Sequence, residues 1–493
     1  MVTLPQATFE CDNLLSAVND PAVVTELINA ELMKGYMIGP LLVSPFRSWR
    51  VSPVGVVTGK FNGKKRLIFD LSAPHGSRIP SINSLIPSEE FSMHYSSIDQ
   101  AIQVILALGP GTWMAKADIT DAFKLLPLHR DQWQWFGLKW QGAYYFASKL
   151  TFGCKSSPWL FDQLAQALHW LLVNVSGCSQ VIHYLDDFLL LSRPREEPDQ
   201  LVRLLKLFTD IGVPVSPKKT VGPTKCLTFL GVILDSVAMQ VSLPTDKLNR
   251  IRDTIHKYTV SQVTTKGELQ SLLGMLAFAM RAIPQGRAFV SRILSLLHGV
   301  PHQHSRVWLD CQALADLNMW DRFMAQWNGT AMFVPPASEL SPKICTDASS
   351  SIGYGAVWGS RWMAGQWSKQ VMALAGFSST SALFEVFPIV AAAVTWGDKW
   401  SGQTVEFQCD NQATVAIVNK GSSGHATVMS FMRRLVWVSL QYNFNFVARH
   451  IPGVDNTAAD ALSRANFHLF SQVAPQADAV GTQPPYLAQL ILD

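Results

Sequence analysis

Two adjacent aspartates, Asp186 and Asp187, interrupt an apolar stretch, V-I-H-Y-L-D-D-F-L-L-L, at residues 181–191. A buried carboxylate without a partner is costly, and neighbouring carboxylates raise each other's pKa. The flanking apolar residues are typical of two short strands, which puts the aspartates at a hairpin tip. The alternative is a solvated turn, although two-residue hairpin turns favour Asn-Gly or Asp-Gly because they need a positive φ. The pair therefore predicts either a cation site or an ordinary turn.

A third carboxylate raises the expectation of a metal. Asp118 lies in A-K-A-D-I-T-D-A-F-K, after a short apolar segment and at an expected strand end. Taken alone, it could equally be a helix N-cap. Three carboxylates on neighbouring strands are the oxygen-rich set that Mg²⁺ prefers, with positions left open for substrate phosphates. Two metals about 4 Å apart stabilise both the attacking and the leaving oxygen of an in-line phosphoryl transfer.

A glutamate in the C-terminal third of the chain lies on an unexpected helix face. Glu385 belongs to the helical pattern S-A-L-F-E-V-F-P-I-V-A-A-A-V-T-W and shares a face with Ile389, Ala392 and Trp396. A glutamate on an apolar helix face is unusual unless it is paired or binds a metal. Glu385 is therefore a candidate metal ligand.

Three aspartates accompany that glutamate. Asp347 ends the strand-like K-I-C-T-D before a Gly-rich hairpin, and Asp410 closes V-E-F-Q-C-D before a helical segment. Asp460 lies in the first turn of the helical N-T-A-A-D-A-L-S-R. For Asp410 the alternative is an N-cap, and for Asp460 it is the favourable interaction of any acid with a helix N-terminus.

The first carboxylates belong to an ordered series of motifs that resembles reverse transcriptases. The motifs are G-K-K-R-L-I-F-D-L-S at 63–72, D-I-T-D-A-F, L-T-F-G-C-K-S-S-P at 150–158, Y-L-D-D, P-K-K-T at 217–220 and F-L-G at 229–231. An ordered series is far more specific than any single short motif. The resemblance implies a multidomain α/β (α+β) fold, in which a right-hand polymerase of fingers, palm and thumb comes first.

The resemblance also implies roles for individual residues near the metals. Asp118, Asp186 and Asp187 would hold two Mg²⁺, with Mn²⁺ as an alternative. Arg66, together with Lys65, would bind the incoming triphosphate, a task that suits a cationic fork.

Three further residues match the nucleotide pocket of the family. Phe123 corresponds to the steric gate, which leaves no room for a ribose 2′-OH and implies dNTP substrates. Lys219 matches the lysine proposed to donate a proton to pyrophosphate, and its alternative is a solvated pair with Lys218. Where relatives often have L-P-Q-G, this chain has L-T-F-G, so Phe152 is expected to line the pocket by packing.

The second carboxylate set resembles the D-E-D-D site of the ribonuclease H family. Asp347, Glu385, Asp410 and Asp460 occur in the order of that family and on its elements, and would hold two Mg²⁺ for phosphodiester cleavage by water. His450 matches a mobile histidine near the scissile phosphate, although a lone histidine in a loop is more often structural. A groove that tests 2′-hydroxyls would select the RNA strand of a hybrid.

Together the two sites imply an enzyme that converts RNA into DNA and degrades the used template. The implied partners are an RNA template, a DNA primer, an RNA/DNA hybrid and dNTPs. Several sequence stretches, among them H-I-P-G-V-D-N-T-A-A-D-A-L-S-R, resemble DIRS-like and Ngaro-like retrotransposons. This resemblance implies a separately encoded tyrosine recombinase as partner, and a chain that is a fragment, a truncated element or part of a split reading frame. The alternatives are a pararetroviral polymerase, a nuclease with an idle polymerase half, and a catalytically idle nucleic-acid-binding remnant.

Composition is compatible with this organisation but does not require it. Of the 493 residues 48% are hydrophobic, which suffices for several cores, and the net charge of +4 permits nucleic acid as a partner. The seven scattered cysteines and the lack of a signal peptide or membrane span predict a reduced, intracellular protein of the cytoplasm or nucleus, or both, without a membrane partner. The expected domains are fingers and palm at 1–240, a helical thumb or connection at 241–333, a linker at 334–342, a ribonuclease H-like domain at 343–466 and a tail at 467–493.

Overall fold

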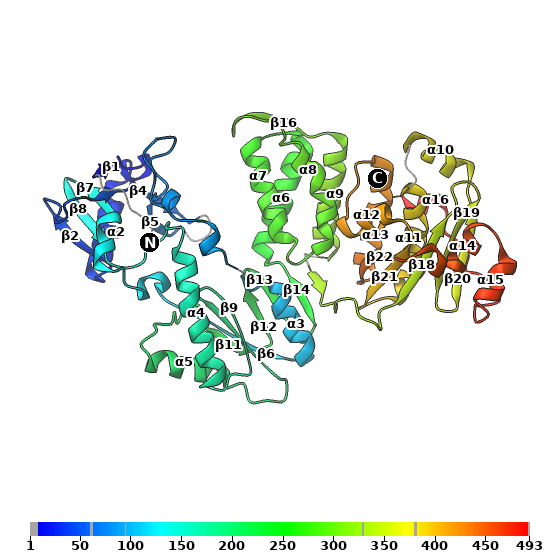
Figure 1. Ribbon diagram of the computed structural model, residues 1–493, viewed down its shortest axis with the longest axis horizontal. Coiled ribbons are helices and arrows are strands. Elements are labelled where there is room, and N and C mark those ends of the chain that lie inside the picture. Colours follow the sequence, from blue (N-terminus) through cyan, green and yellow to red (C-terminus); the bar gives the residue numbers. More distant parts are fainter. Residues whose placement is uncertain (1–7, 60–62, 94, 328–329, 379–381, 492–493) are drawn as a thin grey trace. The chain divides into compact units, whose positions relative to one another are not determined.

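The computed structural model describes residues 8–59, 63–93, 95–327, 330–378 and 382–491. The chain divides into two compact units, one of residues 1–104 and 112–225, the other of residues 105–111 and 226–493 (Figure 1). Each unit contains both sheets and helices, and each is described by itself. No helix in the described ranges has the length and apolarity needed to cross a bilayer.

The first unit contains two larger sheets and a two-stranded ribbon. The five-stranded sheet has the order β1 (Phe9–Glu10), β3 (Arg50–Val51), β7 (Gly137–Trp140), β8 (Ala143–Ala147), β2 (Met37–Leu41). The ribbon is β4 (Val54–Thr58) with β5 (Lys65–Phe69), and the four-stranded sheet is β11 (Val221–Thr224), β6 (Trp113–Asp118), β10 (Asp187–Ser192), β9 (Gln180–Tyr184). The four-stranded sheet carries the first carboxylate set.

Helices cover the four-stranded sheet and bury its apolar residues. Phe188 and Leu190 of β10 are almost fully buried, and they share a core with Phe161 and Phe208 from two helices. Phe188 to Ser192 of β10 are all buried. Burial on both faces explains why the strand is almost continuously apolar, since neither face is left for polar side chains. The helices of this unit are α1 (Leu15–Val18), α2 (Pro21–Met33), α3 (Ile98–Leu108, whose end belongs to the second unit), α4 (Ser157–Asn174) and α5 (Gln200–Asp210), with short turns η1 (Asn83–Leu85), η2 (Glu89–Phe91), η3 (Ala122–Leu125) and η4 (Arg130–Trp135).

The second unit begins with a small sheet and a group of helices. The sheet is β12 (Cys226–Phe229), β13 (Val232–Asp235), β14 (Gln240–Ser242), β17 (Thr330–Met332), and β15 (Val263–Thr265) pairs with β16 (Arg306–Trp308). The helices are α6 (Thr245–Ser261), α7 (Lys266–Ala279), η5 (Pro284–Phe289), α8 (Ser291–Ser295) and α9 (Cys311–Trp327). Thr265 and Glu268 form a reciprocal capping box at the start of α7, which fixes where this helix begins.

The same unit ends in a lobe built on a mixed five-stranded sheet. Its order is β20 (Arg361–Gln366), β19 (Gly353–Trp358), β18 (Lys343–Ala348), β21 (Thr404–Cys409), β22 (Asn445–His450). β18, β21 and β22 run parallel, while β19 and β20 are antiparallel to their neighbours. The helices are α10 (Lys369–Ser378), α11 (Ala382–Trp396), η6 (Gly397–Lys399), α12 (Gln412–Lys420), α13 (Ala426–Gln441), η7 (Gly453–Asp455), α14 (Thr457–Ser463), α15 (Phe467–Val473) and α16 (Leu487–Leu490). Parallel strand ends meet at one edge of this sheet.

Residues between Phe467 and Ile491 pack onto this lobe. The Trp362 ring of β20 contacts the rings of Phe467 and Phe470, and its indole N–H donates to the Asp478 carbonyl at 2.7 Å. Leu490 is fully buried in the lobe's core. The segment that looks like a featureless tail in the sequence therefore covers part of the lobe's sheet and core.

Candidate functional site: two carboxylate clusters

Three aspartates of the first unit converge at one end of its four-stranded sheet. Asp118 is the last residue of β6, and Asp187, the first residue of β10, is its direct cross-strand partner. Asp186 precedes Asp187 in the turn, and its carbonyl accepts the Ile119 N–H at 3.0 Å. The backbone thus fixes all three residues at one point, and Asp118 is a strand-end residue as expected.

The hairpin turn lies one residue earlier than the sequence indicates. β9 ends at Tyr184 and β10 begins at Asp187, so the turn consists of Leu185 and Asp186. Leu185 adopts the left-handed conformation with φ 53°, which is uncommon for a bulky residue. The positive φ that a two-residue turn requires therefore falls on a leucine, and Asp187 remains in the strand.

Burial and mutual repulsion shape the electrostatics of this cluster. Burial, with repulsion from Asp118 and Asp186, raises the pKa of Asp187 to about 6. The pKa of Asp186 is also raised, mainly by burial. Lys219 supplies a counter-charge because its Nζ lies 2.6 Å from Asp118 Oδ1. The lysine predicted from P-K-K-T is therefore a direct neighbour of the carboxylates.

Two of the predicted pocket residues contact each other. The rings of Phe123 and Phe152 lie 4.7 Å apart with a 32° interplanar angle, and Phe123 also packs on Phe161. Phe123 is 9% exposed, whereas Phe152 is 56% exposed. Gly153 follows with φ 93°, and a Cβ there would lie 2.5 Å from the Phe69 carbonyl oxygen. That close approach links the L-T-F-G segment to β5 and explains its glycine.

The two predicted phosphate-binding cations lie on β5. Lys65 and Arg66 are adjacent in the strand and both are exposed. Their side chains leave the strand on opposite sides because consecutive strand residues alternate. Lys65 Nζ lies 2.5 Å from Asp20 Oδ2, so the structure gives this ammonium a partner outside the carboxylate cluster.

The second cluster forms at the edge of the C-terminal sheet. Asp347 lies in β18, is 5% exposed, and accepts a 2.5 Å hydrogen bond from Ser463 Oγ of α14. Glu385 projects from the first turn of α11. Ile389, Ala392 and Trp396, which share its helix face, are buried. Burial, followed by the charges of Asp347 and Asp410, raises the pKa of Glu385 to about 8.

The N-cap role that the sequence offered as an alternative for Asp410 is filled by Asn411. Asp410 follows the last residue of β21, but Asn411 caps α12 by accepting the Thr414 N–H at 3.0 Å. The Asp410 side chain is exposed and free of that capping role. His450 ends β22 and its Nε2 lies 3.1 Å from the Asp410 carbonyl oxygen. The predicted histidine therefore borders the second cluster.

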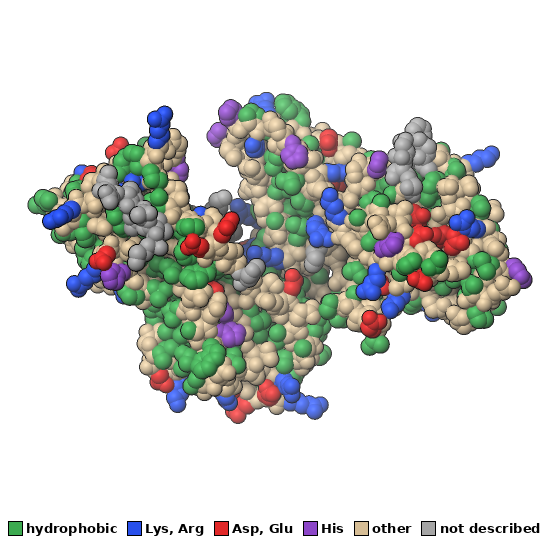
Figure 2. Space-filling view, viewed as in Figure 1, with side chains coloured by type: hydrophobic (Ala, Val, Ile, Leu, Met, Phe, Trp, Pro, Cys, Tyr) green, Lys and Arg blue, Asp and Glu red, His purple; other side chains and the backbone are tan. Residues whose placement is uncertain are grey.

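Asp460 completes the second cluster from α14. It lies in the first turn of this helix, and its Oδ1 accepts the Arg464 Nε–H at 2.7 Å. Burial raises the pKa of Asp347, and the charges of Asp410 and Asp460 raise it further. Asp347 is therefore within electrostatic reach of both Asp410 and Asp460. Figure 2 shows acidic side chains gathered on the visible face of this lobe.

The segment that contains the first cluster matches a known protein family. Residues 63–234 match the family model described as reverse transcriptase (RNA-dependent DNA polymerase). Residues 63–234 therefore correspond to a reverse transcriptase domain. All three aspartates of the first cluster lie inside this domain, as do Lys65, Arg66 and Lys219.

The curated relatives of the chain include retroviral polyproteins. The chain is 28% identical over 312 residues to the Gag-Pro-Pol polyprotein of Human T-cell leukemia virus 2, covering 62% of this chain and 19% of the relative. It is 30% identical over 176 residues to the Gag-Pol polyprotein of Walleye dermal sarcoma virus, covering 35% of this chain and 9% of the relative. The chain thus spans less than a fifth of the length of these relatives.

Solved structures share the mixed α/β multidomain fold. The foamy viral protease-reverse transcriptase in complex with RNA/DNA hybrid matches with a TM-score of 0.52 at 15% identity, over 91% of this chain and 56% of that chain. A related foamy viral structure in complex with double-stranded DNA matches with a TM-score of 0.51 at 16% identity, over 91% of this chain and 72% of that chain. At these identities the likeness establishes the fold, and it extends well beyond the reverse transcriptase domain.

The donor atoms of both clusters fit divalent metal ions. Each cluster offers carboxylate oxygens from several elements. The raised pKa values of Asp187 and Glu385 have burial and neighbouring carboxylates as their causes, and a nearby cation would oppose both effects. Hard oxygen donors suit Mg²⁺. The second cluster also contains a residue that the sequence did not single out, since Cys409 Sγ donates to Glu385 Oε2 at 3.7 Å. In the sequence, the one signal for Cys409 is its position directly before Asp410. Its contact with Glu385 could not be predicted, because Glu385 comes from a different element.

Proposed function

We propose that the chain is an RNA-directed DNA polymerase that also carries ribonuclease H activity in its C-terminal lobe. The observation that supports it best is the meeting of Asp118, Asp186 and Asp187 at one strand pair inside the reverse transcriptase domain. The second carboxylate cluster, on a separate sheet, supports a second phosphodiester chemistry. The proposed domains keep the expected limits: fingers and palm at 1–240, thumb or connection at 241–333, linker at 334–342, ribonuclease H-like domain at 343–466 and tail at 467–493.

In the polymerase site, Asp118, Asp186 and Asp187 would hold two Mg²⁺, or Mn²⁺. When bound, such ions lower the charge on the reacting phosphate and on the attacking and leaving oxygens. Lys219 carries a proton 2.6 Å from Asp118 and is placed to release it toward a leaving pyrophosphate. Its hydrogen bond to Asp118 and the charges of the other aspartates hold its pKa above the usual value despite the opposing effect of burial.

The pocket residues would select and orient the nucleotide. Phe123 is held against Phe152 and Phe161, so its ring cannot easily move aside for a 2′-OH. The exposed Phe152 ring would pack against the incoming dNTP, in place of an amide hydrogen bond. Arg66, with its exposed guanidinium on β5, is a better candidate for the triphosphate than Lys65, which pairs with Asp20.

In the nuclease site, Asp347, Glu385, Asp410 and Asp460 would hold two Mg²⁺. Ser463 fixes one oxygen of Asp347, and Arg464 orients Asp460. Glu385, with a pKa of about 8, would bind a proton at neutral pH until a cation displaces it. His450, exposed beside Asp410, would act near the scissile phosphate.

The proposed partners are an RNA template, a DNA primer, RNA/DNA hybrid and dNTPs. The foamy viral structures with the same fold are complexes with double-stranded DNA and with RNA/DNA hybrid, which supports nucleic-acid partners here. The motif phrases support an origin in a DIRS-like or Ngaro-like retrotransposon, with a separately encoded tyrosine recombinase as partner. A cytoplasmic or nuclear location stays a prediction.

Reciprocal substitutions test the two assignments separately. Asp186→Asn is expected to reduce DNA synthesis by about 100-fold or more and to leave cleavage of the RNA strand within a few-fold, because it removes charge from one cluster only. Asp410→Asn is expected to do the reverse. Each variant serves as the folding control for the other, with both activities measured on one RNA/DNA substrate. A substitution that spared its assigned activity would overturn that assignment.

A further inference from the structure

Cys409 gives the second cluster a sulfur donor. It is the last residue of β21, fully buried, and directly precedes Asp410. Its Sγ and one carboxylate oxygen each of Glu385 and Asp410 all lie within 4.8 Å of one another. These three side chains come from the end of a strand, the residue after it and the first turn of α11. Their spacing permits one ion to contact all three.

The chemistry of this trio differs from that of a site made only of oxygens. Mg²⁺ gains little from sulfur, whereas Zn²⁺ and Cd²⁺ bind thiolate strongly, and Zn²⁺ takes Cys with Asp or Glu in four-coordinate sites. The Asn411 backbone N–H donates to Cys409 Sγ at 3.3 Å, and Sγ faces Glu385 Oε2 at 3.7 Å. Burial, followed by the charge of Glu385, raises the pKa of the Cys409 thiol, so a bound ion has to displace its proton. The Asp410 side chain is exposed, so the cluster is open to ions from solvent on that side.

We propose that Glu385, Cys409 and Asp410 form a site for a thiophilic divalent cation, Zn²⁺ or Cd²⁺. Binding forms one metal–sulfur bond, releases the Cys409 proton to solvent and changes no oxidation state. Because Glu385 and Asp410 are also proposed Mg²⁺ ligands, occupancy by the thiophilic ion would inhibit RNA cleavage. This inhibition rests on the proposed function, whereas the binding itself does not.

Absorption spectroscopy tests the binding without any activity. The full chain with the exposed Cys226 and Cys311 replaced by serine is reduced, freed of metal and titrated with Cd²⁺ or Co²⁺. We expect a sulfur-to-metal charge-transfer band that saturates at one equivalent. Cys409→Ser should abolish the band. Cys345→Ser is the matched control, because Cys345 lies in the neighbouring strand β18 and contacts Gln408 instead of the trio, and this variant should retain the band.

Inhibition provides the second readout. The Zn²⁺ concentration that halves RNA cleavage, taken relative to each variant's own rate in Mg²⁺, should rise about tenfold or more in Cys409→Ser. Absence of the band in the chain that retains Cys409 would overturn the proposal, even if Cys409→Ser failed to fold. A band without any RNA cleavage would support the site and contradict the proposed nuclease function. RNA cleavage without a band would do the opposite.

Discussion

At the scale of single residues, the fold disfavours the charge of Asp187 in the first cluster. Its pKa of about 6 lies above the usual 3.8 because burial and the charges of Asp118 and Asp186 disfavour the anion. The folded state therefore holds the proton more tightly than the unfolded state. Stability that is present at acidic pH is lost as the pH rises through about 6, so the penalty is complete at neutral pH.

Asp187→Asn is therefore expected to stabilise the metal-free chain at neutral pH, by about 1–2 kcal/mol. The amide keeps the shape of the side chain and removes its charge. Chemical denaturation with a chelator present measures the gain, and Mg²⁺ should then stabilise the unsubstituted chain more than the variant. A variant that is less stable than the unsubstituted chain without metal would show that the cluster does not suffer from repulsion.

Two histidines of the first unit predict a second pH effect with the opposite sign. His169 Nδ1 and His183 Nδ1 lie 3.1 Å apart, and His183 Nε2 faces Asp162 at 3.6 Å. Burial lowers the pKa of both, and His183 lowers that of His169 further, whereas Asp162 only partly offsets burial at His183. The folded state thus binds fewer protons, so stability is complete above about pH 6.5 and falls below it.

Hydrogen exchange of α4 and β9 between about pH 7.5 and pH 5.5 checks this prediction. Protection should fall on acidification by about 1 kcal/mol. His183→Gln should flatten that dependence, and His129→Gln, at a histidine that is 77% exposed, should leave it unchanged. An equally steep acid dependence in His183→Gln would rule out the pair as its source.

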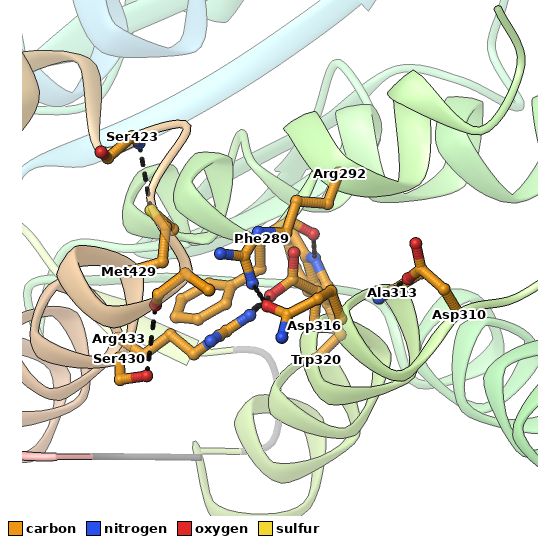
Figure 3. A network of polar contacts seen from close by, with 12 residues as sticks. Phe289, Arg292, Asp310, Ala313, Asp316, Trp320, Ser423, Met429, Ser430 and Arg433 are labelled. Atoms are coloured by element: carbon orange, nitrogen blue, oxygen red, sulfur yellow. Dashed lines mark hydrogen bonds and ion pairs between the residues drawn. The ribbon is translucent and has the colours of Figure 1, made fainter. Parts of the chain in front are cut away.

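At the scale of elements, a buried ion pair joins the helices before the C-terminal lobe to the lobe itself. Arg433 of α13 donates from Nε and Nη2 to Asp316 Oδ1 of α9, at 3.0 and 2.7 Å (Figure 3). The two side chains are 3% and 0% exposed. Asp316 Oδ2 is buried without a hydrogen-bond partner, and Arg292 lies close enough for its charge to act on Asp316. Without Arg433, the carboxylate of Asp316 would be a buried charge without its hydrogen-bonded partner, which is strongly destabilising.

Arg433→Met is expected to destabilise the second unit by about 3–5 kcal/mol, because it leaves the Asp316 carboxylate buried and unpaired. The double variant Asp316→Leu with Arg433→Met should recover most of this loss, since it removes both charges. Thermal unfolding of the full chain measures both. The idea would fail if the single variant were as stable as the unsubstituted chain, or if the double variant were no better than the single one.

Elements also show what the sequence can and cannot predict. The strand ends at Asp118 and Asp410, and the cap at Thr265, follow from local patterns, because strand periodicity and capping chemistry act over a few residues. The left-handed Leu185 does not, since no local signal favours a leucine with positive φ. The Asp316–Arg433 pair joins residues 117 positions apart, a distance at which a single sequence carries no pairing signal.

The candidate sites follow the same division. Both carboxylate sets were predictable because acids placed at strand ends and on an apolar helix face are chemically unusual. The contacts of Lys65 with Asp20 and of Cys409 with Glu385 could not be predicted, because the partners come from other elements. The packing of Phe467 and Phe470 onto Trp362 likewise depends on tertiary contacts that the composition of this segment does not reveal.

At the scale of the whole molecule, the chain combines two carboxylate clusters, one in each compact unit. A reverse transcriptase domain holds the first, and the C-terminal sheet holds the second. The fold shared with foamy viral protease-reverse transcriptase spans both units. We propose that the same chain extends a DNA strand and removes its RNA template, with one cluster responsible for each reaction.

Primer extension on a labelled RNA template tests that claim most directly. The full chain is mixed with a labelled DNA primer, dNTPs and Mg²⁺, and both strands are followed on one gel. We expect the DNA strand to lengthen while the RNA strand shortens, and both changes to stop when a chelator removes the metal. A well-folded chain that produced neither change would contradict the account, and RNA shortening without DNA growth would contradict its polymerase half.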